Sequence, residues 1–316
     1  MNAAVIHSFD EGPRYDSFAL PPGGEGVPIE VLAAGLSPRV RSAASGQHYT
    51  SRGVLPLVPG IDGVGRLADG RRVYFFAAND TLGTMAERTL ADDRLAVPLP
   101  DAVSASAAAA LMLPAISSWV ALTKRAPLQP GQSVLVLGAT GTSGQLAVQI
   151  AKLLGAGEVI AVGRNAAALE RTRAHGADRV VALAGRREDA DAVAAAASEV
   201  DVVLDYLWGE VASAVMPQIC RARQDEHRAL RWVLIGSVAG DELALSSVLL
   251  RKRNLHILGS GQGASSTREI FGTTPDIVAA LAAGQLSAAV REAPLAEVAR
   301  WWSAPLDSGE RLVFVP

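Results

Sequence analysis

The sequence contains very little cysteine: Cys220 is the single thiol among 316 residues. One cysteine excludes an intrachain disulfide and any zinc site that needs several thiolates. The chain also lacks a strong excess of charge, because its net charge is −3 and its pI is near 6.0. A chain without a basic excess has no global field to attract nucleic acid, so we expect no nucleic-acid partner.

Long apolar runs are missing as well. The most apolar stretch, 104–122, is rich in alanine and is interrupted by serines and by Pro114, so we expect no membrane span. The N-terminal sequence MNAAVIHSFDEGP has no basic start followed by an apolar core, which a secretory signal would require. These features predict a cytoplasmic globular protein, and 316 residues are enough for two domains.

The chain divides into regions with different patterns of apolar and turn residues. Residues 1 to about 110 hold short apolar runs between Gly, Pro and Asp-Gly pairs, which is typical of a β-rich domain, with a hairpin expected at Asp69-Gly70. From about 130 to 261, apolar runs alternate with helix-length segments, which predicts a parallel sheet covered on both faces. The tail, 264–316, is expected to form one or two helices and a last strand, RLVFVP. The strands expected in the parallel sheet are 133–138, 158–163, 179–183, 201–207, 231–237 and 255–259.

Six such strands indicate the doubly wound Rossmann fold, and a glycine-rich turn follows the first of them. Gly138, Gly141 and Gly144 recur every third residue. Gly141 would let a pyrophosphate approach the backbone, and Gly144 would let the helix pack close to the strand. Thr142 and Ser143 would begin that helix, whose free N–H groups favour phosphate. A tight turn without a ligand is the alternative, but the strand before and the helix after favour dinucleotide binding.

The second strand of this region ends in Gly163, Arg164 and Asn165. Folds that bind NAD usually carry Asp or Glu here, which hydrogen-bonds the ribose 2′-hydroxyl. A carboxylate would repel a 2′-phosphate, whereas a guanidinium binds one through charge-assisted hydrogen bonds. We therefore predict NADPH as the cofactor, while an exposed arginine at a helix start is the alternative. Further cofactor contacts are expected at the ends of later strands: Leu207, Gly236, Ser237, Gly259, Ser260 and Gly261.

Four segments carry a resemblance to a known family. VLAAGLSPRVRSAASGQHY, LPLVPGIDGVGRL, PLQPGQSVLVLGATGTSGQLAVQIAKLLGA and GERLVFVP resemble the medium-chain dehydrogenase/reductase superfamily, on its zinc-independent quinone oxidoreductase branch. The resemblance implies a GroES-like β-rich catalytic domain formed by 1–113 and 263–316, with a Rossmann domain, 114–262, inserted into it and a cleft between them. It also implies a homodimer, in which the edge strand 255–259 of each subunit pairs across a two-fold axis.

The chain departs from the zinc enzymes of that superfamily. Ser37 matches the position of their first cysteine ligand, and Gly60-Ile61-Asp62 stands where they have Gly-His-Glu. Isoleucine cannot bind zinc, and the thiolate donors are missing, so we expect no metal. Asp62 is expected to hydrogen-bond to backbone in a turn. The quinone branch commonly has an aspartate where this chain has Val40, so close identity with known quinone reductases is not implied.

The resemblance also suggests catalytic and cofactor residues. Tyr49 matches a frequent aromatic beside the nicotinamide, and its hydroxyl or that of Ser37 could donate to a carbonyl oxygen. His48 could serve the same role, and Ser117 resembles a family hydroxyl near the nicotinamide. For each, an ordinary packing or loop role is the alternative. The implied function is NADPH-dependent, zinc-independent reduction of a quinone or an α,β-unsaturated carbonyl. A non-catalytic NADPH-binding protein, structural or regulatory, is the alternative.

Overall fold

The computed structural model describes residues 1–20 and 26–316, and the chain divides into two compact units. The first unit is Met1–Leu113 with Thr274–Pro316, and the second is Pro114–Thr273. The second boundary lies later than the 262/263 predicted from the sequence. The difference includes helix α8 (Thr267–Phe271), which belongs to the second unit.

The second unit contains the parallel sheet. Its strands lie in the order β12-β11-β10-β7-β8-β9, which is the Rossmann order, and every pairing is parallel. This confirms the predicted doubly wound fold and places β12 at an edge of the sheet. The strands are β7 (Ser133–Leu137), β8 (Glu158–Gly163), β9 (Arg179–Ala182), β10 (Val202–Asp205), β11 (Leu230–Leu234) and β12 (Leu255–Gly259).

Two of these strands end earlier than the sequence predicts. The expected strands 201–207 and 231–237 stop at Asp205 and Leu234. The reason is hydrogen bonding: the Asp205 carbonyl accepts from the N–H groups of both Ile235 and Gly236, at 2.8 and 3.1 Å. Because one carbonyl accepts both bonds, the regular hydrogen-bond pattern between β10 and β11 ends there.

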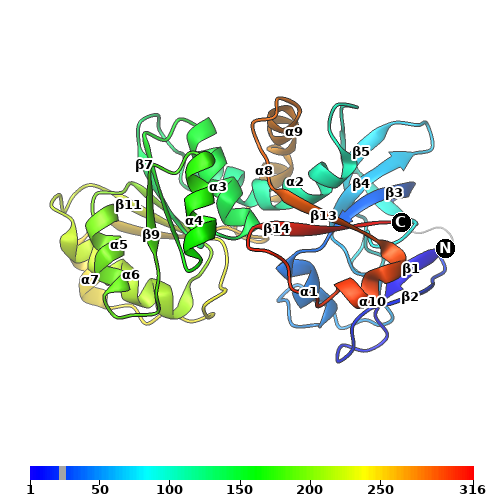
Figure 1. Cartoon of the computed structure of the whole chain (residues 1–316), viewed down its shortest axis with the longest axis horizontal. Helices are drawn as coiled ribbons and strands as arrows, with labels where there is room; N and C mark the ends of the chain where they lie inside the picture. Colours follow the sequence, from blue (N-terminus) through cyan, green and yellow to red (C-terminus); the bar gives the residue numbers. More distant parts are fainter. Residues whose placement is uncertain (21–25) are drawn as a thin grey trace. The chain divides into compact units, whose positions relative to one another are not determined.

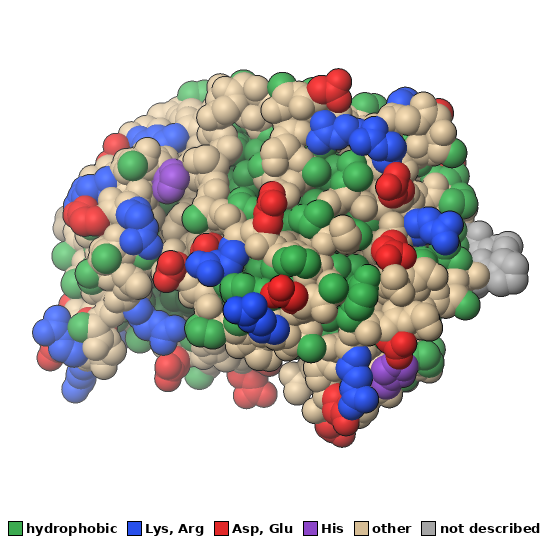
Figure 2. All heavy atoms as spheres, turned by 45° about the vertical axis from the view of Figure 1, so that its right-hand side comes forward, with side chains coloured by type: hydrophobic (Ala, Val, Ile, Leu, Met, Phe, Trp, Pro, Cys, Tyr) green, Lys and Arg blue, Asp and Glu red, His purple; other side chains and the backbone are tan. Residues whose placement is uncertain are grey.

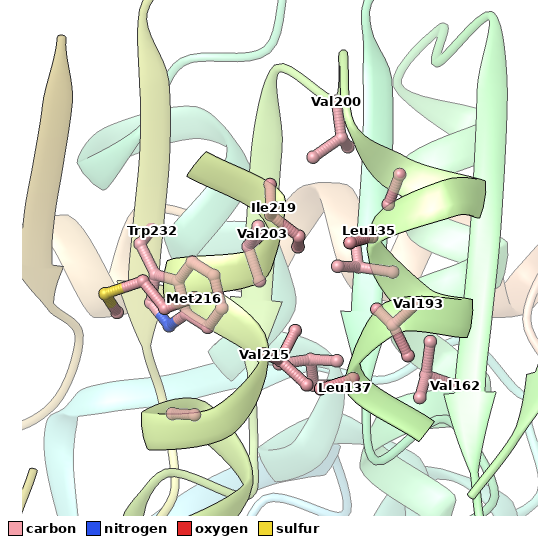
Figure 3. Packing of buried hydrophobic residues seen from close by; sticks show 14 of the residues in the cluster. Leu135, Leu137, Val162, Val193, Val200, Val203, Val215, Met216, Ile219 and Trp232 are labelled. Atoms are coloured by element: carbon pink, nitrogen blue, oxygen red, sulfur yellow. The ribbon is translucent and has the colours of Figure 1, made fainter. Parts of the chain in front are cut away.

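Helices cover both faces of the parallel sheet (Figure 1). On one face lie α3 (Thr142–Leu153) and α4 (Ala166–Ala174), and on the other lie α5 (Asp189–Ala197) and α6 (Gly209–Ala222). The α5–α6 face packs on the strands through a buried apolar cluster in which Val193 and Met216 face Leu135 and Trp232 (Figure 3). Helix α7 (Ser247–Lys252) comes before β12.

One long helix begins in the first unit and continues into the second. It consists of α2 (Ala105–Val120) and a π-helical turn, η1 (Ala121–Arg125). By length and composition, Ala105–Arg125 could cross a membrane, but 78% of its most apolar stretch is buried inside the structure. Burial of this degree is typical of a core helix in a globular protein.

The first unit is built on a six-stranded sheet in the order β13-β14-β3-β4-β5-β6. Strand β3 also pairs with β6, so β3, β4, β5 and β6 close into a ring of antiparallel strands. The hairpin expected at Asp69-Gly70 is confirmed, because β4 and β5 flank it and Gly70 has φ +88°. These strands are β3 (Val27–Gly35), β4 (Asp62–Leu67), β5 (Arg72–Ala77), β6 (Arg88–Pro98), β13 (Ala289–Pro294) and β14 (Glu310–Val315).

The remaining elements of this unit come from both ends of the chain. The last strand expected from RLVFVP is confirmed as β14, whereas its parallel neighbour β13 was not predicted. The smaller elements are β1 (Asn2–Val5), β2 (Arg14–Ser17), α1 (Pro38–Ala44), α9 (Thr274–Ala282), η2 (Leu295–Glu297) and α10 (Val298–Trp301). The core of this unit contains side chains from β14, β5 and β3, where Phe314, Phe75 and Ile29 are buried together.

Candidate dinucleotide and acceptor sites

The glycine-rich turn after β7 uses its three glycines differently. A Cβ on Gly144 would lie 2.2 Å from the carbonyl oxygen of Gly138, so the close packing of α3 on the turn requires a glycine there. Gly138 has φ +92°, which favours glycine. Gly141 has φ −77° and ψ 164°, and a Cβ there would meet nothing within 4 Å. The fold therefore does not need a glycine at 141, and the open space beside it suits an approaching ligand.

Helix α3 begins at this open position. Gly141 is its N-cap, and a glycine has no side chain with which to cap the helix. The first N–H groups of a helix have no partner within it, so those of Thr142, Ser143 and Gly144 are oriented toward whatever lies before the helix. Together with the helix dipole they favour an anion such as a pyrophosphate.

The three residues predicted to surround the ribose lie at the end of β8, and each has a different role there. A Cβ on Gly163 would lie 2.6 Å from Cγ2 of Thr140, so this glycine is explained by packing. Asn165 is the N-cap of α4, and its Oδ1 accepts from the N–H of Ala168 at 2.9 Å. Arg164 is exposed, and no hydrogen bond or ion pair occupies it within residues 1–20 and 26–316. Arg164 is therefore the member of the three that is available to a ligand.

The residues expected at later strand ends fall into two groups. Leu207 lies beside the glycine turn, because a Cβ on Gly138 would be 3.1 Å from its Cδ2. Gly236 lies beside Tyr206, which also adjoins the turn: a Cβ on Gly236 would be 3.0 Å from the carbonyl oxygen of Tyr206, and one on Gly138 would be 3.2 Å from its Cβ. Ser237 donates its hydroxyl to Oδ1 of Asp241 at 2.6 Å.

Gly259, Ser260 and Gly261 lie further from the glycine turn. Gly259 ends the edge strand β12 and the other two follow it, and β11 and β10 separate β12 from β7. The carbonyl oxygen of Gly259 accepts from Nε of Arg125 at 2.7 Å, and the N–H of Ser260 donates to Leu234 at 2.8 Å. Gly138, Leu207 and Gly236 therefore lie near one another. The three residues at the end of β12 lie apart from that group.

Ser117 lies on α2, and its hydroxyl donates to the carbonyl oxygen of Pro114 at 2.7 Å. The neighbouring Ser118 is fully buried, and its hydroxyl is 2.8 Å from that of Tyr206. Burial raises the pKa of Tyr206, which lies directly after β10. Ser118 thus links the long helix to the strand end beside the glycine turn, a role that the sequence did not reveal.

In the first unit, Ser37 and Tyr49 lie at either end of the segment that contains α1. Ser37 is the N-cap of α1, and its Oγ accepts from the N–H of Val40 at 3.2 Å. Its hydroxyl hydrogen is still available to a second acceptor. Tyr49 is 73% exposed and stacks on His48 with ring centroids 4.4 Å apart. Nδ1 of His48 is 2.7 Å from the hydroxyl of Thr50.

The expectation for Asp62 is wrong. It does not lie in a turn but begins β4, where it is 2% exposed and its side chain accepts from the Tyr74 hydroxyl at 2.9 Å. Burial raises the pKa of Asp62 to about 6, against the opposing effects of the Tyr74 hydrogen bond and of the charges on Arg39 and Arg311. The sequence pattern missed this because the buried partner, Tyr74, comes from the next strand.

Arg39 and Arg311 give this region positive charge that the sequence analysis overlooked. Arg39 is the second residue of α1; burial lowers its pKa, and the neighbouring Tyr49 and Asp62 oppose that shift. After burial itself, Arg39 is the cause that lowers the pKa of His48. Arg311, on β14, is 7% exposed and donates to the carbonyl oxygen of Leu36 at 3.1 Å, and burial lowers its pKa to about 10. The sequence pointed only to Arg39, which is one of the two arginines in SPRVRS.

Zinc does not fit the residues of this region. Within residues 1–20 and 26–316, no three His, Cys, Asp or Glu side chains come together as a metal site. Ile61, next to Asp62, offers no donor atom, and zinc favours nitrogen and sulfur ligands.

Comparison with known proteins agrees with this architecture. A family profile described as "Zinc-binding dehydrogenase" matches residues 144–277. The chain is 31% identical to the "Probable NADPH-dependent quinone reductase tdiC" of Emericella nidulans, and the match covers 94% of both chains. It is 26% identical to "Quinone oxidoreductase-like protein 2" of Rattus norvegicus, over 76% of this chain and 68% of that one.

Solved structures extend the similarity to the whole chain. A "probable oxidoreductase" from Mycobacterium abscessus superposes with a TM-score of 0.81 at 27% identity, covering 100% of this chain and 99% of that one. The quinone oxidoreductase of Thermus thermophilus, also solved in complex with NADPH, gives a TM-score of 0.77 at 25% identity, with 100% of both chains covered.

Proposed function

The chain belongs to the medium-chain dehydrogenase/reductase superfamily as a quinone oxidoreductase-like oxidoreductase, and on that premise we propose that it uses NADPH to reduce a quinone or an α,β-unsaturated carbonyl without a metal. The observation that carries the proposal is the open space at Gly141, the N-cap residue of helix α3. A glycine that the fold does not need, at the point where helix N–H groups converge, fits a pyrophosphate.

The choice of NADPH over NADH depends on Arg164. When bound, NADPH would supply the hydride, and the protein would supply binding and orientation. The N–H groups of Thr142 to Gly144 would hold the pyrophosphate. The exposed guanidinium of Arg164 would bind the 2′-phosphate, at a position where a carboxylate would favour NADH. Leu207, which adjoins the glycine turn, and Gly236, which adjoins Tyr206 next to it, would contact the rest of the nucleotide.

The acceptor would gain negative charge on a carbonyl oxygen as the hydride arrives. That charge needs a donor or a nearby cation. We assign the donor to the hydroxyls of Tyr49 and Ser37, and the positive charge to Arg39, which lies close enough for Tyr49 to oppose the lowering of its pKa by burial. Zinc independence is part of the same proposal, because Ile61 supplies no ligand where the zinc enzymes have histidine.

The remaining features of the proposal concern assembly and location. We propose a homodimer joined through β12, since this edge strand leaves backbone groups open to pairing. Acidic and basic side chains are mixed on the face that Figure 2 shows, and we propose a small molecule as the partner and no nucleic acid or membrane. A cytoplasmic location stays a prediction from the N-terminal sequence.

The test follows NADPH absorbance with 1,4-benzoquinone, 9,10-phenanthrenequinone and a short enone. We expect oxidation of NADPH with at least one acceptor, and none with the Gly141→Val variant, whose side chain would occupy the place of the pyrophosphate. Tight NADPH binding without turnover of any acceptor would refute the reductase and favour a non-catalytic NADPH-binding role.

A further inference from the structure

Asp205 is a buried carboxylate that the proposed reaction does not use. It ends β10 and is 0% exposed. Its Oδ1 accepts from the backbone N–H groups of Leu207 and Trp208, at 2.8 and 2.9 Å. Its Oδ2 accepts from Nε1 of Trp232, on β11, at 2.8 Å. A buried carboxylate is tolerated when donors of this kind satisfy it.

The turn that Asp205 holds has an unfavourable backbone conformation. Trp208 has φ +53° and is the one non-glycine residue with positive φ in the described part of the chain. Bulky side chains rarely adopt such angles, and they persist when the surroundings impose them. Next to it, Gly209 has φ +51°, and a Cβ there would lie 2.1 Å from the carbonyl oxygen of Ala239. The two hydrogen bonds from the turn to Asp205 hold this geometry together with the hydrogen bond from the N–H of Ala239 to the carbonyl oxygen of Leu207.

The same turn adjoins the candidate nucleotide site. Leu207 lies against the glycine turn, where a Cβ on Gly138 would be 3.1 Å from its Cδ2. The Leu207 carbonyl accepts from the N–H of Ala239 at 2.7 Å, and the Asp205 carbonyl accepts from that of Gly236 at 3.1 Å. Asp205 therefore connects three segments that meet at the carboxyl end of the sheet: the glycine turn, the turn after β10 and the loop after β11.

We propose that the Asp205–Trp232 pair positions the nucleotide site: it holds Leu207 against the glycine turn and so sets the affinity for NADPH without touching the nucleotide. The inference rests on the proposed NADPH site. Asp205 and Trp232 act through the turn and are positioning residues. The indole is held in place by the core cluster, where it lies beside Met216 of α6 (Figure 3).

The ionised form of Asp205 is the one that accepts three hydrogen bonds. Burial raises its pKa, and the N–H groups of Trp208, Leu207 and Trp232 oppose that shift; no charged side chain takes part. Protonation would remove acceptor capacity and release the turn. NADPH affinity should therefore be lost as pH falls through the pKa of Asp205. Removal of the indole donor should raise that pKa and move the loss to higher pH.

The decisive variant is Trp232→Phe, which keeps an aromatic ring in the core and removes the N–H donor. Trp301→Phe is the matched control, because Nε1 of Trp301 also donates to a carboxylate, that of Glu297 at 3.0 Å, but in the first unit. The dissociation constant of NADPH is measured from the fluorescence of the nucleotide itself across a pH series. Ionisation of the 2′-phosphate affects all variants equally, so it cancels in the comparison.

We expect Trp232→Phe to weaken NADPH binding about tenfold at neutral pH, the effect of losing one charge-assisted hydrogen bond. The midpoint of its pH profile should move upward, while kcat at saturating NADPH changes less than the affinity. A purely structural role would lower thermal stability without moving that midpoint. If Trp232→Phe does not fold, Asp205→Asn serves instead, and its binding should lose the part of the pH dependence that Asp205 causes.

Two results would overturn the inference and are distinguishable. If the wild type binds NADPH tightly and Trp232→Phe has the same affinity and pH midpoint, the positioning role is wrong and the proposed function stands. If the wild type binds no NADPH at any pH, the proposed function fails and this inference fails with it.

Discussion

The glycine turn allows a matched experiment, because Gly141 and Gly144 lie one helical turn apart and have opposite surroundings. In Gly144→Ala, the new Cβ would lie 2.2 Å from the oxygen of Gly138 and 2.6 Å from Cα of Ala139. Both are backbone atoms, so helix α3 must move away by more than an ångström to restore an ordinary contact. In Gly141→Ala, the new methyl group meets no protein atom within 4 Å.

The expected magnitudes follow from these distances. Overpacking of this kind costs about 1–3 kcal/mol, so Gly144→Ala should lower Tm by roughly 2–12 °C. Gly141→Ala combines two small opposing effects. Reduced freedom of the unfolded chain stabilises by about 0.4–1 kcal/mol, whereas alanine is a poorer N-cap than glycine by about the same amount. Its Tm should stay within about 3 °C of the wild type.

For NADPH affinity we expect the opposite order from that for thermal stability: Gly141→Ala should be affected more than Gly144→Ala. The methyl group of Gly141→Ala would enter the space assigned to the pyrophosphate, and we expect NADPH affinity to fall at least about tenfold, or about 1.4 kcal/mol. Calorimetry measures the binding, and thermal unfolding measures the stability. An unchanged NADPH affinity in Gly141→Ala would refute the assignment of the pyrophosphate, and an unchanged Tm in Gly144→Ala would refute the packing argument.

Four further outcomes are expected. NADPH should bind at least about tenfold more tightly than NADH, and Arg164→Ala should erase most of that difference; equal affinities in the wild type would contradict the role of Arg164. Tyr49→Phe should lower kcat about tenfold through loss of its hydroxyl, and an unchanged kcat would remove Tyr49 from the mechanism. Elemental analysis should find no stoichiometric zinc, and chelators should leave activity intact. Light scattering should report a dimer at micromolar concentration, and a monomer would count against pairing through β12.

The parallel sheet was predictable because its signal is local. Each of the six strands is a short apolar run between turn residues, and the order of strands and helices along the chain restricts the topology to a few arrangements. The glycine turn was predictable for the same reason, since its spacing and position between strand and helix appear directly in the sequence. β13 was not predicted, because AVREAP has two consecutive charged residues, Arg291 and Glu292, in place of an apolar run, and its partner β14 lies later in the chain.

The sequence by itself determined which residue types lie at each strand end, and hence the fold, the glycine turn and the lack of zinc ligands at the positions where the zinc enzymes have them. Only the tertiary structure decided what those residues do. It showed that Gly163 and Gly144 serve packing while Gly141 does not, because that distinction depends on which atoms face the missing Cβ. It also buried Asp62 against Tyr74 and Asp205 against Trp232, across neighbouring strands. A carboxylate's environment is set by residues far away in the chain, so its pKa and its role follow from the folded contacts.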